Sequence, residues 1–329
     1  MVDSVRMPPR VVVIGDLVID VVFAPTSNLD RTTDVVGKVC FRQGGSAATT
    51  ARWLARLGLR TSLITSVGRD IFGETLVAYL RRRKVTVHVA RLPRVGTGRM
   101  GVLLDGEEGR SFVADRRAAT ALPVMAIRRS WLAGADALHI PAYCIFEEPL
   151  ASATTHAVEV ARETGALVSL DLASTSFILA HGATYVREKI AALGPELLVG
   201  TLAEARALLG HDRVADLTAI SPLVVVKRGA QGATVFRRAN PVESVDVPTP
   251  PLVLKDTTGA GDAFMAGLLK VWLRHSGGAH IPLSVLASAA RAGHQAAARE
   301  LLGPRPELHL RCPDRARTAV RDATTRDTR

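Results

Sequence analysis

The segment Asp256–Phe264, with the sequence DTTGAGDAF, has the residue types and spacing for phosphoryl chemistry. Gly259 and Gly261 let the backbone approach a ligand closely, and N–H groups at the start of a helix form a cradle for an anion. Asp262 falls at the predicted start of the next helix, where the helix dipole favours its ionised form. An ionised carboxylate there can take a proton from an attacking hydroxyl while backbone amides hold the phosphoryl oxygens. The segment therefore predicts a base beside an anion hole.

Two other interpretations of this segment are weaker. An Asp after a glycine turn can simply cap a helix, which would suffice for Gly261-Asp262 alone but not for all nine residues. A Gly-x-Gly sequence also occurs in dinucleotide-binding folds. Here it comes late in the chain, without the GxGxxG that follows the first strand of such folds.

Strand-like and helix-like segments alternate along most of the chain. Val11–Asp16 is a continuous apolar, β-branched run, as expected for a strand covered on both faces. Further strands are predicted at 61–67, 137–140, 167–170, 197–199, 223–227 and 252–254, and helices at 47–57, 72–83, 154–163, 203–209, 263–274 and 282–301. This alternation predicts an α/β fold with a central, mostly parallel sheet flanked by helices.

Two stretches interrupt the alternation. Val21–Phe41 and Val85–Val113 contain short β-like pieces separated by turn residues, and Asp105–Gly109 is a good hairpin turn. They predict a small inserted β-sheet that serves as a lid or an interface. We expect one α/β domain over 1–303, a β lid at about 21–41 and 85–117, and a polar, partly flexible tail over 304–329.

The composition, charge and cysteine spacing of the chain argue against several classes of protein. Apolar residues make up 47% and charged residues 22%, which is usual for a globular protein. The net charge of +11 is spread along the chain, so it does not indicate a nucleic-acid partner. Three distant cysteines without a CxxC pair indicate neither disulfides nor a zinc site. No apolar run could span a membrane and no signal peptide is evident, so we expect a cytoplasmic protein.

The motifs resemble those of one family. DTTGAGDAF resembles the C-terminal signature of the ribokinase/PfkB carbohydrate kinases, whose last Asp is the catalytic base. The segment Gly44–Ala51, followed by Gly58 and then by Gly68–Gly73, is similar to their N-terminal signature in residues and spacing. Weaker similarities occur at Thr97-Gly98, Asp105-Gly106, Asp171, Glu204 and Lys227–Gly232. The resemblance covers about residues 10 to 303 and implies a ribokinase-like fold and an ATP-dependent sugar kinase.

The resemblance also implies roles for individual residues. It makes Asp262 the base, with Gly259, Ala260 and Gly261 as the anion hole. The implied substrate-binding residues are Asp20, Gly44 and Gly45. Asp16 is added to the substrate site because it would share one side with Asp20 if the first strand continued, and Thr49 because it stands where the family has a substrate-binding Asn. The implied ATP-binding residues are Lys227, Gly229, Gly232, Ala287 and Ala290. Glu204 would organise Mg²⁺ through water, and Asp256 with the Thr258 carbonyl would bind a monovalent cation such as K⁺. A homodimer formed through the β lid is expected.

Three arginines near the lid bear on whether the substrate is negatively charged. Arg99, Arg116 and Arg117 could meet an anionic substrate, because guanidinium groups suit carboxylate and phosphate. In a chain so rich in arginine they are more often surface residues. We assign Arg116 to the substrate site.

Three residues depart from the family pattern. Thr49 replaces an Asn that contacts substrate, Thr201 replaces the Asn of an Asn-x-x-Glu motif, and Ala142 replaces a Gly. The base and the anion hole are intact, so we expect an active kinase with an atypical substrate or a modest rate. The alternatives are a nucleoside kinase, which the scarcity of lid aromatics disfavours, and a non-catalytic ligand-binding regulator on the same fold.

Overall fold

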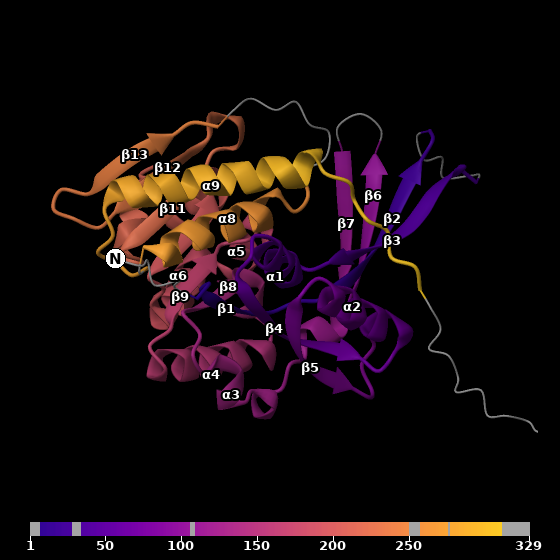
Figure 1. Ribbon diagram of the computed structural model, residues 1–329. Coiled ribbons are helices and arrows are strands. Elements are labelled where there is room, and N and C mark those ends of the chain that lie inside the picture. Colours follow the sequence, from indigo (N-terminus) through magenta and orange to yellow (C-terminus); the bar gives the residue numbers. More distant parts are fainter. Residues whose placement is uncertain (1–6, 28–33, 106–108, 250–256, 276, 311–329) are drawn as a thin grey trace, which may run out of the picture.

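A large twisted sheet forms the centre of the protein. The structure, a computed structural model, describes residues 7–27, 34–105, 109–249, 257–275 and 277–310 (Figure 1). In this part of the chain, nine strands pair in the order β13-β12-β11-β10-β9-β8-β1-β4-β5. The strands are β1 (Arg10–Ile14), β4 (Arg60–Gly68), β5 (Val85–Leu92), β8 (Ala137–Pro141), β9 (Leu167–Asp171), β10 (Leu197–Thr201), β11 (Leu223–Lys227), β12 (Ala233–Arg237) and β13 (Glu243–Val247).

The predicted mostly parallel sheet is confirmed. The strands from β11 to β5 run parallel, and among the described strands of this sheet only β12 and β13, at one edge, pair antiparallel. The β12–β13 hairpin was missed in the sequence, since its segments are short and partly polar. The strand predicted at 252–254 lies outside the described residues.

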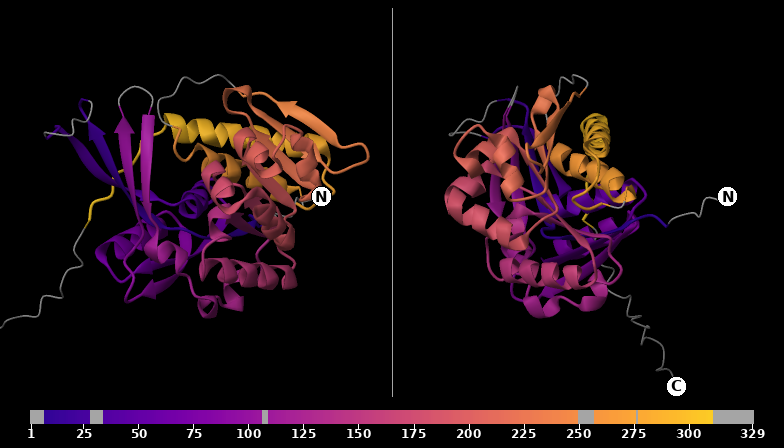
Figure 2. Two further views of the ribbon diagram at one scale, coloured as in Figure 1. Left: turned by 180° about the vertical axis from the view of Figure 1, so that it is seen from behind. Right: turned by 90° about the vertical axis from the view of Figure 1, so that its left-hand side faces the viewer.

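Helices cover both faces of the sheet (Figures 1 and 2). They are α1 (Ser46–Arg56), α2 (Ile71–Arg82), α3 (Arg129–Leu132), α4 (Leu150–Glu163), α5 (Thr175–His181), α6 (Ala183–Leu193), α7 (Leu202–Leu209), α8 (Ala260–Arg274) and α9 (Leu283–Leu302). Along β1, Val11 and Val13 belong to the core beneath α1, α2, α8 and α9, whereas Val12 and Ile14 belong to the core beneath α3 to α7. This alternation explains why the strand is apolar at every position.

A second, four-stranded sheet projects from one end of the central sheet (Figure 1). It has the order β3-β2-β6-β7 and contains β2 (Val18–Pro25), β3 (Gly37–Gly44), β6 (Arg99–Asp105) and β7 (Gly109–Asp115). This is the expected small β lid, with one correction. β5, over 85–92, is not part of it, because it follows helix α2 and pairs in parallel with β4 at the edge of the central sheet. A strand–helix–strand unit of this kind favours parallel pairing in the main sheet.

The break between β1 and β2 decides where the two N-terminal aspartates lie. An uninterrupted first strand from Val11 through Asp20 would place both on one side of the central sheet. Instead β1 ends at Ile14, and Gly15 adopts a φ of 145°. Asp16 lies in the turn, and Asp20 lies on lid strand β2. The lid therefore begins earlier than residue 21 and carries Asp20 itself.

The first part of the expected tail packs against the lid. After α9 the chain passes β3, where the N–H of Leu308 donates to the carbonyl of Phe41 at 2.7 Å, and Leu308 is buried. Glu307 accepts a hydrogen bond from Lys38 of β3 at 2.5 Å. Residues 303–310 thus run beside the lid, as Figure 1 shows. Packed structure continues past the boundary expected at 303. Within the described residues, no helix is long and apolar enough to cross a membrane.

Candidate active site

The start of helix α8 has the geometry of an anion-binding site. Gly259 is in the left-handed region, with φ 77°, and the helix begins at Ala260. The first N–H groups of an α-helix have no partners within the helix and carry the positive end of its dipole. The N–H of Ala260 donates to the Thr257 carbonyl at 3.3 Å. Of the three residues predicted to form the anion hole, Gly261 is therefore better placed than Ala260 to offer its N–H to a ligand.

Asp262, in the first turn of α8, lies in the pocket and contacts Ser46. The Ser46 hydroxyl donates to Asp262 Oδ1 at 2.6 Å. Burial raises the pKa of Asp262 to about 8, and the charges of Asp171 and Asp16 add to this, while Ser46 and Lys227 lower it. The helix dipole was expected to keep this carboxylate ionised, whereas the loss of hydration on burial favours its protonated form.

Lys227, at the end of β11, faces the anion-hole segment. Its ammonium group donates to Asp171 Oδ2 at 2.8 Å. A Cβ atom on Gly261 would lie 3.5 Å from Lys227 Nζ, so the two groups are close. Burial disfavours the charged lysine, but Asp171 and Glu204 more than offset it, and the pKa of Lys227 is raised. A charged lysine beside a helix N-terminus suits a phosphate.

Asp16 positions helix α1. Its Oδ1 accepts the N–H of Ala47 at 3.0 Å, in the first turn of α1, and its backbone carbonyl accepts the N–H of Ala48. Gly45, with φ 95°, passes so close that a Cβ there would lie 2.5 Å from the Asp16 carbonyl oxygen. Asp16 therefore holds the helix that presents Ser46 to Asp262.

The side chain of Asp20, on lid strand β2, lies against Gly44 at the end of β3. A Cβ on Gly44 would lie 1.8 Å from Asp20 Oδ1, so a glycine is required for this rotamer of Asp20. Burial, together with the charge of Asp16, raises the pKa of Asp20 to about 7, and the charge of Arg42 opposes this shift. A desolvated carboxylate gains by accepting hydroxyl groups from a ligand.

Asp16, Asp20, Ser46 and Asp262 line one pocket of about 470 Å³, within the usual range for small-molecule sites, whereas Lys227, Ala260 and Gly261 are not part of its lining. Its walls come from the turn after β1, from the lid, and from the first turns of α1 and α8. The predicted residues at its surface are Asp16, Asp20, Gly44, Gly45, Thr49, Arg116, Thr258, Gly259 and Asp262. The two end motifs of the sequence thus meet at one site.

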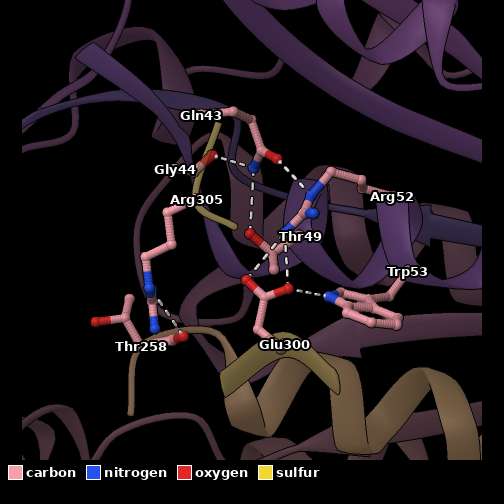
Figure 3. A network of polar contacts seen from close by, with 8 residues as sticks. All are labelled: Gln43, Gly44, Thr49, Arg52, Trp53, Thr258, Glu300 and Arg305. Atoms are coloured by element: carbon pink, nitrogen blue, oxygen red, sulfur yellow. Dashed lines mark hydrogen bonds and ion pairs between the residues drawn. The ribbon is translucent and has the colours of Figure 1, made fainter. Parts of the chain in front are cut away.

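A polar network runs along one side of this pocket (Figure 3). Gln43 donates from Nε2 to the Thr49 hydroxyl at 3.1 Å and accepts Arg52 Nε at 3.2 Å. Glu300, near the end of α9, accepts Arg52 Nη2 at 3.3 Å and Trp53 Nε1 at 2.5 Å. Thr49, the replacement for Asn, is thereby connected to α9 through side chains of α1 and β3.

Arg116 lies in the pocket and not on the surface. Its guanidinium carbon is 4.3 Å from the ring centre of Tyr143 and 4.8 Å from that of Phe177, and its Nη1 is 4.0 Å from Asp16 Oδ2. The two rings and the carboxylate fix the guanidinium at the wall of the site.

None of the five predicted nucleotide-binding residues is part of the lining of this pocket, although Lys227 lies close to Gly261. Gly229 and Gly232 are in the turn between β11 and β12, and a Cβ on Gly232 would lie 2.1 Å from the Val247 carbonyl oxygen. Close packing of β12 and β13 therefore accounts for Gly232. Ala287 and Ala290 are buried in the core shared by α8 and α9. This matches the close-packing alternative for an Ala-rich helix, and their contact with adenine stays a prediction.

The predicted metal residues have structural partners. Glu204 Oε2 accepts the Thr201 N–H at 2.7 Å and the Thr201 hydroxyl accepts the Glu204 N–H at 3.2 Å, a capping box at the start of α7. Thr201 thus has a structural use where the family has Asn. Asp256 lies outside the described residues, and the Thr258 carbonyl accepts Arg305 Nη1 at 3.3 Å. Among the described side chains, no cluster of three or more His, Cys, Asp or Glu groups could hold a metal ion.

Several site residues were missed in the sequence. Ser46 was within the quoted glycine motif, and its place between Gly45 and a helix was a usable signal. Tyr143, Phe177, Glu300 and Arg305 lie far along the chain from the motifs that they contact. No local pattern marks them.

Comparison with solved structures defines the class of the fold. Adenosine kinase from Sinorhizobium meliloti superposes with a TM-score of 0.75 at 23% identity, over 91% of this chain and 96% of that chain. A fructokinase from Vibrio cholerae O395, solved with fructose, ADP and potassium, has a TM-score of 0.75 at 26% identity, over 90% and 93% of the two chains. The fold is that of the ribokinase-like kinases.

Sequence comparison identifies the family. Residues 8–301 match the family model described as pfkB family carbohydrate kinase. Probable fructokinase-4 of Arabidopsis thaliana is 28% identical over 272 residues, which cover 79% of this chain and 81% of the relative. The chain belongs to the pfkB family of carbohydrate kinases, as its two motifs predicted.

Proposed function

We propose that this protein transfers the γ-phosphoryl group of ATP to a hydroxyl of a small sugar or sugar derivative, with Asp262 as the base. The observation that carries the proposal is the position of Asp262, in one pocket with Asp20 and in the first turn of α8. Its raised pKa, about 8, is near the pH at which a general base works best.

The reaction follows from these positions. Asp20 orients the sugar by accepting its hydroxyl groups, and Asp262 takes the proton of the hydroxyl that attacks the γ-phosphorus. The bond between that phosphorus and its bridging oxygen breaks, and ADP leaves. The N-terminus of α8 and the Lys227 ammonium stabilise negative charge on the phosphoryl oxygens. These residues supply positioning and electrostatic stabilisation.

ATP and Mg²⁺ are the proposed cofactors. The α8 N-terminus and Lys227 suit phosphates, and Mg²⁺, which readily keeps several water ligands, would supply further positive charge to them. Glu204 and Asp171, both near Lys227, are the acids that would bind such waters. Since one oxygen of Glu204 already accepts the Thr201 N–H, contact through water suits it better than direct ligation.

A sugar fits better than a nucleoside. The relatives include proteins named fructokinases, and one structural neighbour is an adenosine kinase. Tyr143 and Phe177 could stack on a base, which favours a nucleoside as second candidate. However, the Arg116 guanidinium lies over both rings. A base would have to displace it, whereas a sugar could receive hydrogen bonds from it.

The lid offers a surface for a homodimer. On its face away from the pocket, Phe23, Val39 and Val113 are 43%, 58% and 74% exposed. The strand register places Phe23 opposite Val39 and places Val113 on the same face. Apolar side chains gathered on one sheet face support pairing with a second lid. A requirement for ATP is consistent with the cytoplasmic location expected from the sequence.

The test is an ADP-release assay with ATP and Mg²⁺ over hexoses, pentoses, sugar acids, sugar phosphates and nucleosides. Fructose or a related sugar is expected to give the highest kcat/KM. Asp262→Asn is the matched control, since it should still bind ATP in calorimetry. Tight binding of sugar or nucleotide without ADP formation over hours would favour the regulator, and preference for nucleosides would favour the second candidate.

A further inference from the structure

Arg305 lies on the loop that leads into the anion hole. Its Nη1 donates to the Thr258 carbonyl at 3.3 Å, as drawn in Figure 3. Thr258 immediately precedes Gly259, the left-handed residue before helix α8. A positive charge that binds this carbonyl fixes the orientation of the peptide whose N–H belongs to Gly259. It therefore acts on the geometry of the anion hole through this peptide.

The chain segment that carries Arg305 is held on both sides. Before it, helix α9 ends at Leu302 in contact with α8. After it, the Leu308 N–H donates to the Phe41 carbonyl at 2.7 Å, and Glu307 accepts Lys38 at 2.5 Å. Arg305 is thus placed by packing and not by chance contact of a free tail. It also lines the substrate pocket together with Thr258.

The Glu300 carboxylate, which also lies near this loop, already has partners for its negative charge. Glu300 Oε1 would lie 3.1 Å from a Cβ on Gly259, so its carboxylate is close to the loop. That carboxylate accepts Arg52 and Trp53 Nε1. A free monovalent cation that bound the Thr258 carbonyl would compete with Arg305 for the oxygen and would be repelled by its charge. The carbonyl site is therefore a poor fit for K⁺ in this chain.

We propose that Arg305 is a built-in cation for the anion-hole loop, a positioning residue that makes phosphoryl transfer independent of K⁺. The inference rests on the proposed function, but it concerns the loop and not the identity of the sugar. It replaces the bound monovalent cation that the family resemblance implied. Whether the cation is Arg305 or K⁺, its contact with the Thr258 carbonyl oxygen orders the backbone amides that hold phosphate.

The first test compares the protein in KCl and in tetramethylammonium chloride at equal ionic strength. For the wild-type protein we expect the same kcat, the same Kd for the ATP analogue AMP-PNP, and the same unfolding midpoint in both salts. A rise in kcat of more than about twofold with K⁺, together with tighter AMP-PNP binding, would overturn the proposal, because it would show a separate cation site that orders the loop.

The second test uses Arg305→Gln. We expect kcat to fall about 10- to 100-fold, as when a group that orients a ligand from behind is removed, with a smaller change in the KM for sugar. Guanidinium or K⁺ at millimolar concentration should restore part of the loss, and Arg305→Lys should keep most of the rate. The control is Arg299→Gln, which removes the same charge from an exposed position on α9 and should leave kcat unchanged.

The outcomes separate this inference from the proposed function. If no substrate gives ADP, the proposed function fails. In that case the binding of AMP-PNP decides the role of Arg305. Its affinity for the wild type should be the same in the two salts, and it should bind Arg305→Gln more weakly than Arg299→Gln. Equal AMP-PNP affinity in the two variants, or a kcat for Arg305→Gln that matches the wild type, would overturn the inference. Failure of the wild type to bind AMP-PNP would overturn both.

Discussion

The hydroxyl of Ser46 donates a hydrogen bond of 2.6 Å to the carboxylate of Asp262. It connects the first residue of α1, which follows the glycine pair of the lid, with the first turn of α8. A hydrogen bond to the charged form lowers the pKa of a carboxylate, whereas burial raises it. Here burial is the larger effect, and the pKa is about 8. The pKa of this carboxylate is therefore set by two opposed effects, burial and the Ser46 hydrogen bond.

Asp262→Asn should lower kcat by about 10²- to 10⁴-fold, the usual effect of losing a general base. The amide keeps the shape of the side chain and can still contact Ser46, so substrate affinity should change little. Steady-state kinetics on the best substrate, with calorimetry for ATP binding, provide the measurement. Turnover near that of the wild type would exclude Asp262 as the base.

Ser46→Ala should move the pH profile of kcat/KM to higher pH. In the wild type, kcat/KM should rise with pH through about 8, as Asp262 loses its proton. Without the donated hydrogen bond, the ionised form is less stable, and the apparent pKa should rise by about one unit. Ser46→Thr, which keeps a hydroxyl, is the control. An unshifted profile in Ser46→Ala would show that the bond does not influence proton transfer.

The same pKa shift predicts how stability depends on pH. The ordinary pKa of Asp262 is 3.8 and its folded value is about 8, so the folded state binds more protons than the unfolded state between these values. The contribution of Asp262 to the free energy of unfolding is therefore complete below about pH 4 and is lost as pH rises through 8. Asp262→Asn has no such loss. It should exceed the wild type in unfolding free energy by about 1–3 kcal/mol at pH 8.5, after allowance for screening by pocket water.

Urea denaturation of both proteins at pH 5 and at pH 8.5 is the measurement. The difference between variant and wild type should grow with pH. A constant difference would mean that the carboxylate is not protonated in the folded protein at pH 5.

The sequence predicted features that depend on a short stretch of residues, but not features that depend on contacts between distant segments. The central strands follow from continuous apolar runs such as 11–14 and 223–226, and the anion hole follows from nine consecutive residues. Asp20 could not be placed, because the bend at Gly15 decides which sheet it joins. The pKa of Asp262 depends on burial by distant segments. Glu300 and Arg305 contact residues 247 or 47 positions away, and such contacts leave no periodic or motif signal.

Glu300→Ala should lower the free energy of unfolding by about 1–3 kcal/mol, because it leaves the Arg52 guanidinium and the Trp53 N–H without their carboxylate partner. The Arg52 and Glu300 side chains are only 14% and 13% exposed, so water can replace little of the interaction. Glu163→Ala is the matched control, since the Arg129–Glu163 pair is 65% and 54% exposed and should contribute almost nothing. Equal effects of the two substitutions in urea denaturation would contradict a structural role for the network beside Thr49.

Gly44→Ala should raise the KM for the sugar about 10- to 100-fold, because the new methyl group displaces the Asp20 carboxylate and weakens about two hydrogen bonds to sugar hydroxyls. The Cβ would lie 1.8 Å from Asp20 Oδ1. Gly101→Ala is the control on neighbouring strand β6, where the nearest atom, Val113 Cβ, is 3.7 Å away. Asp262 is untouched in both variants, so kcat at saturating sugar should fall less than kcat/KM. If Gly44→Ala binds sugar as tightly as Gly101→Ala, Asp20 is not the residue that holds the substrate.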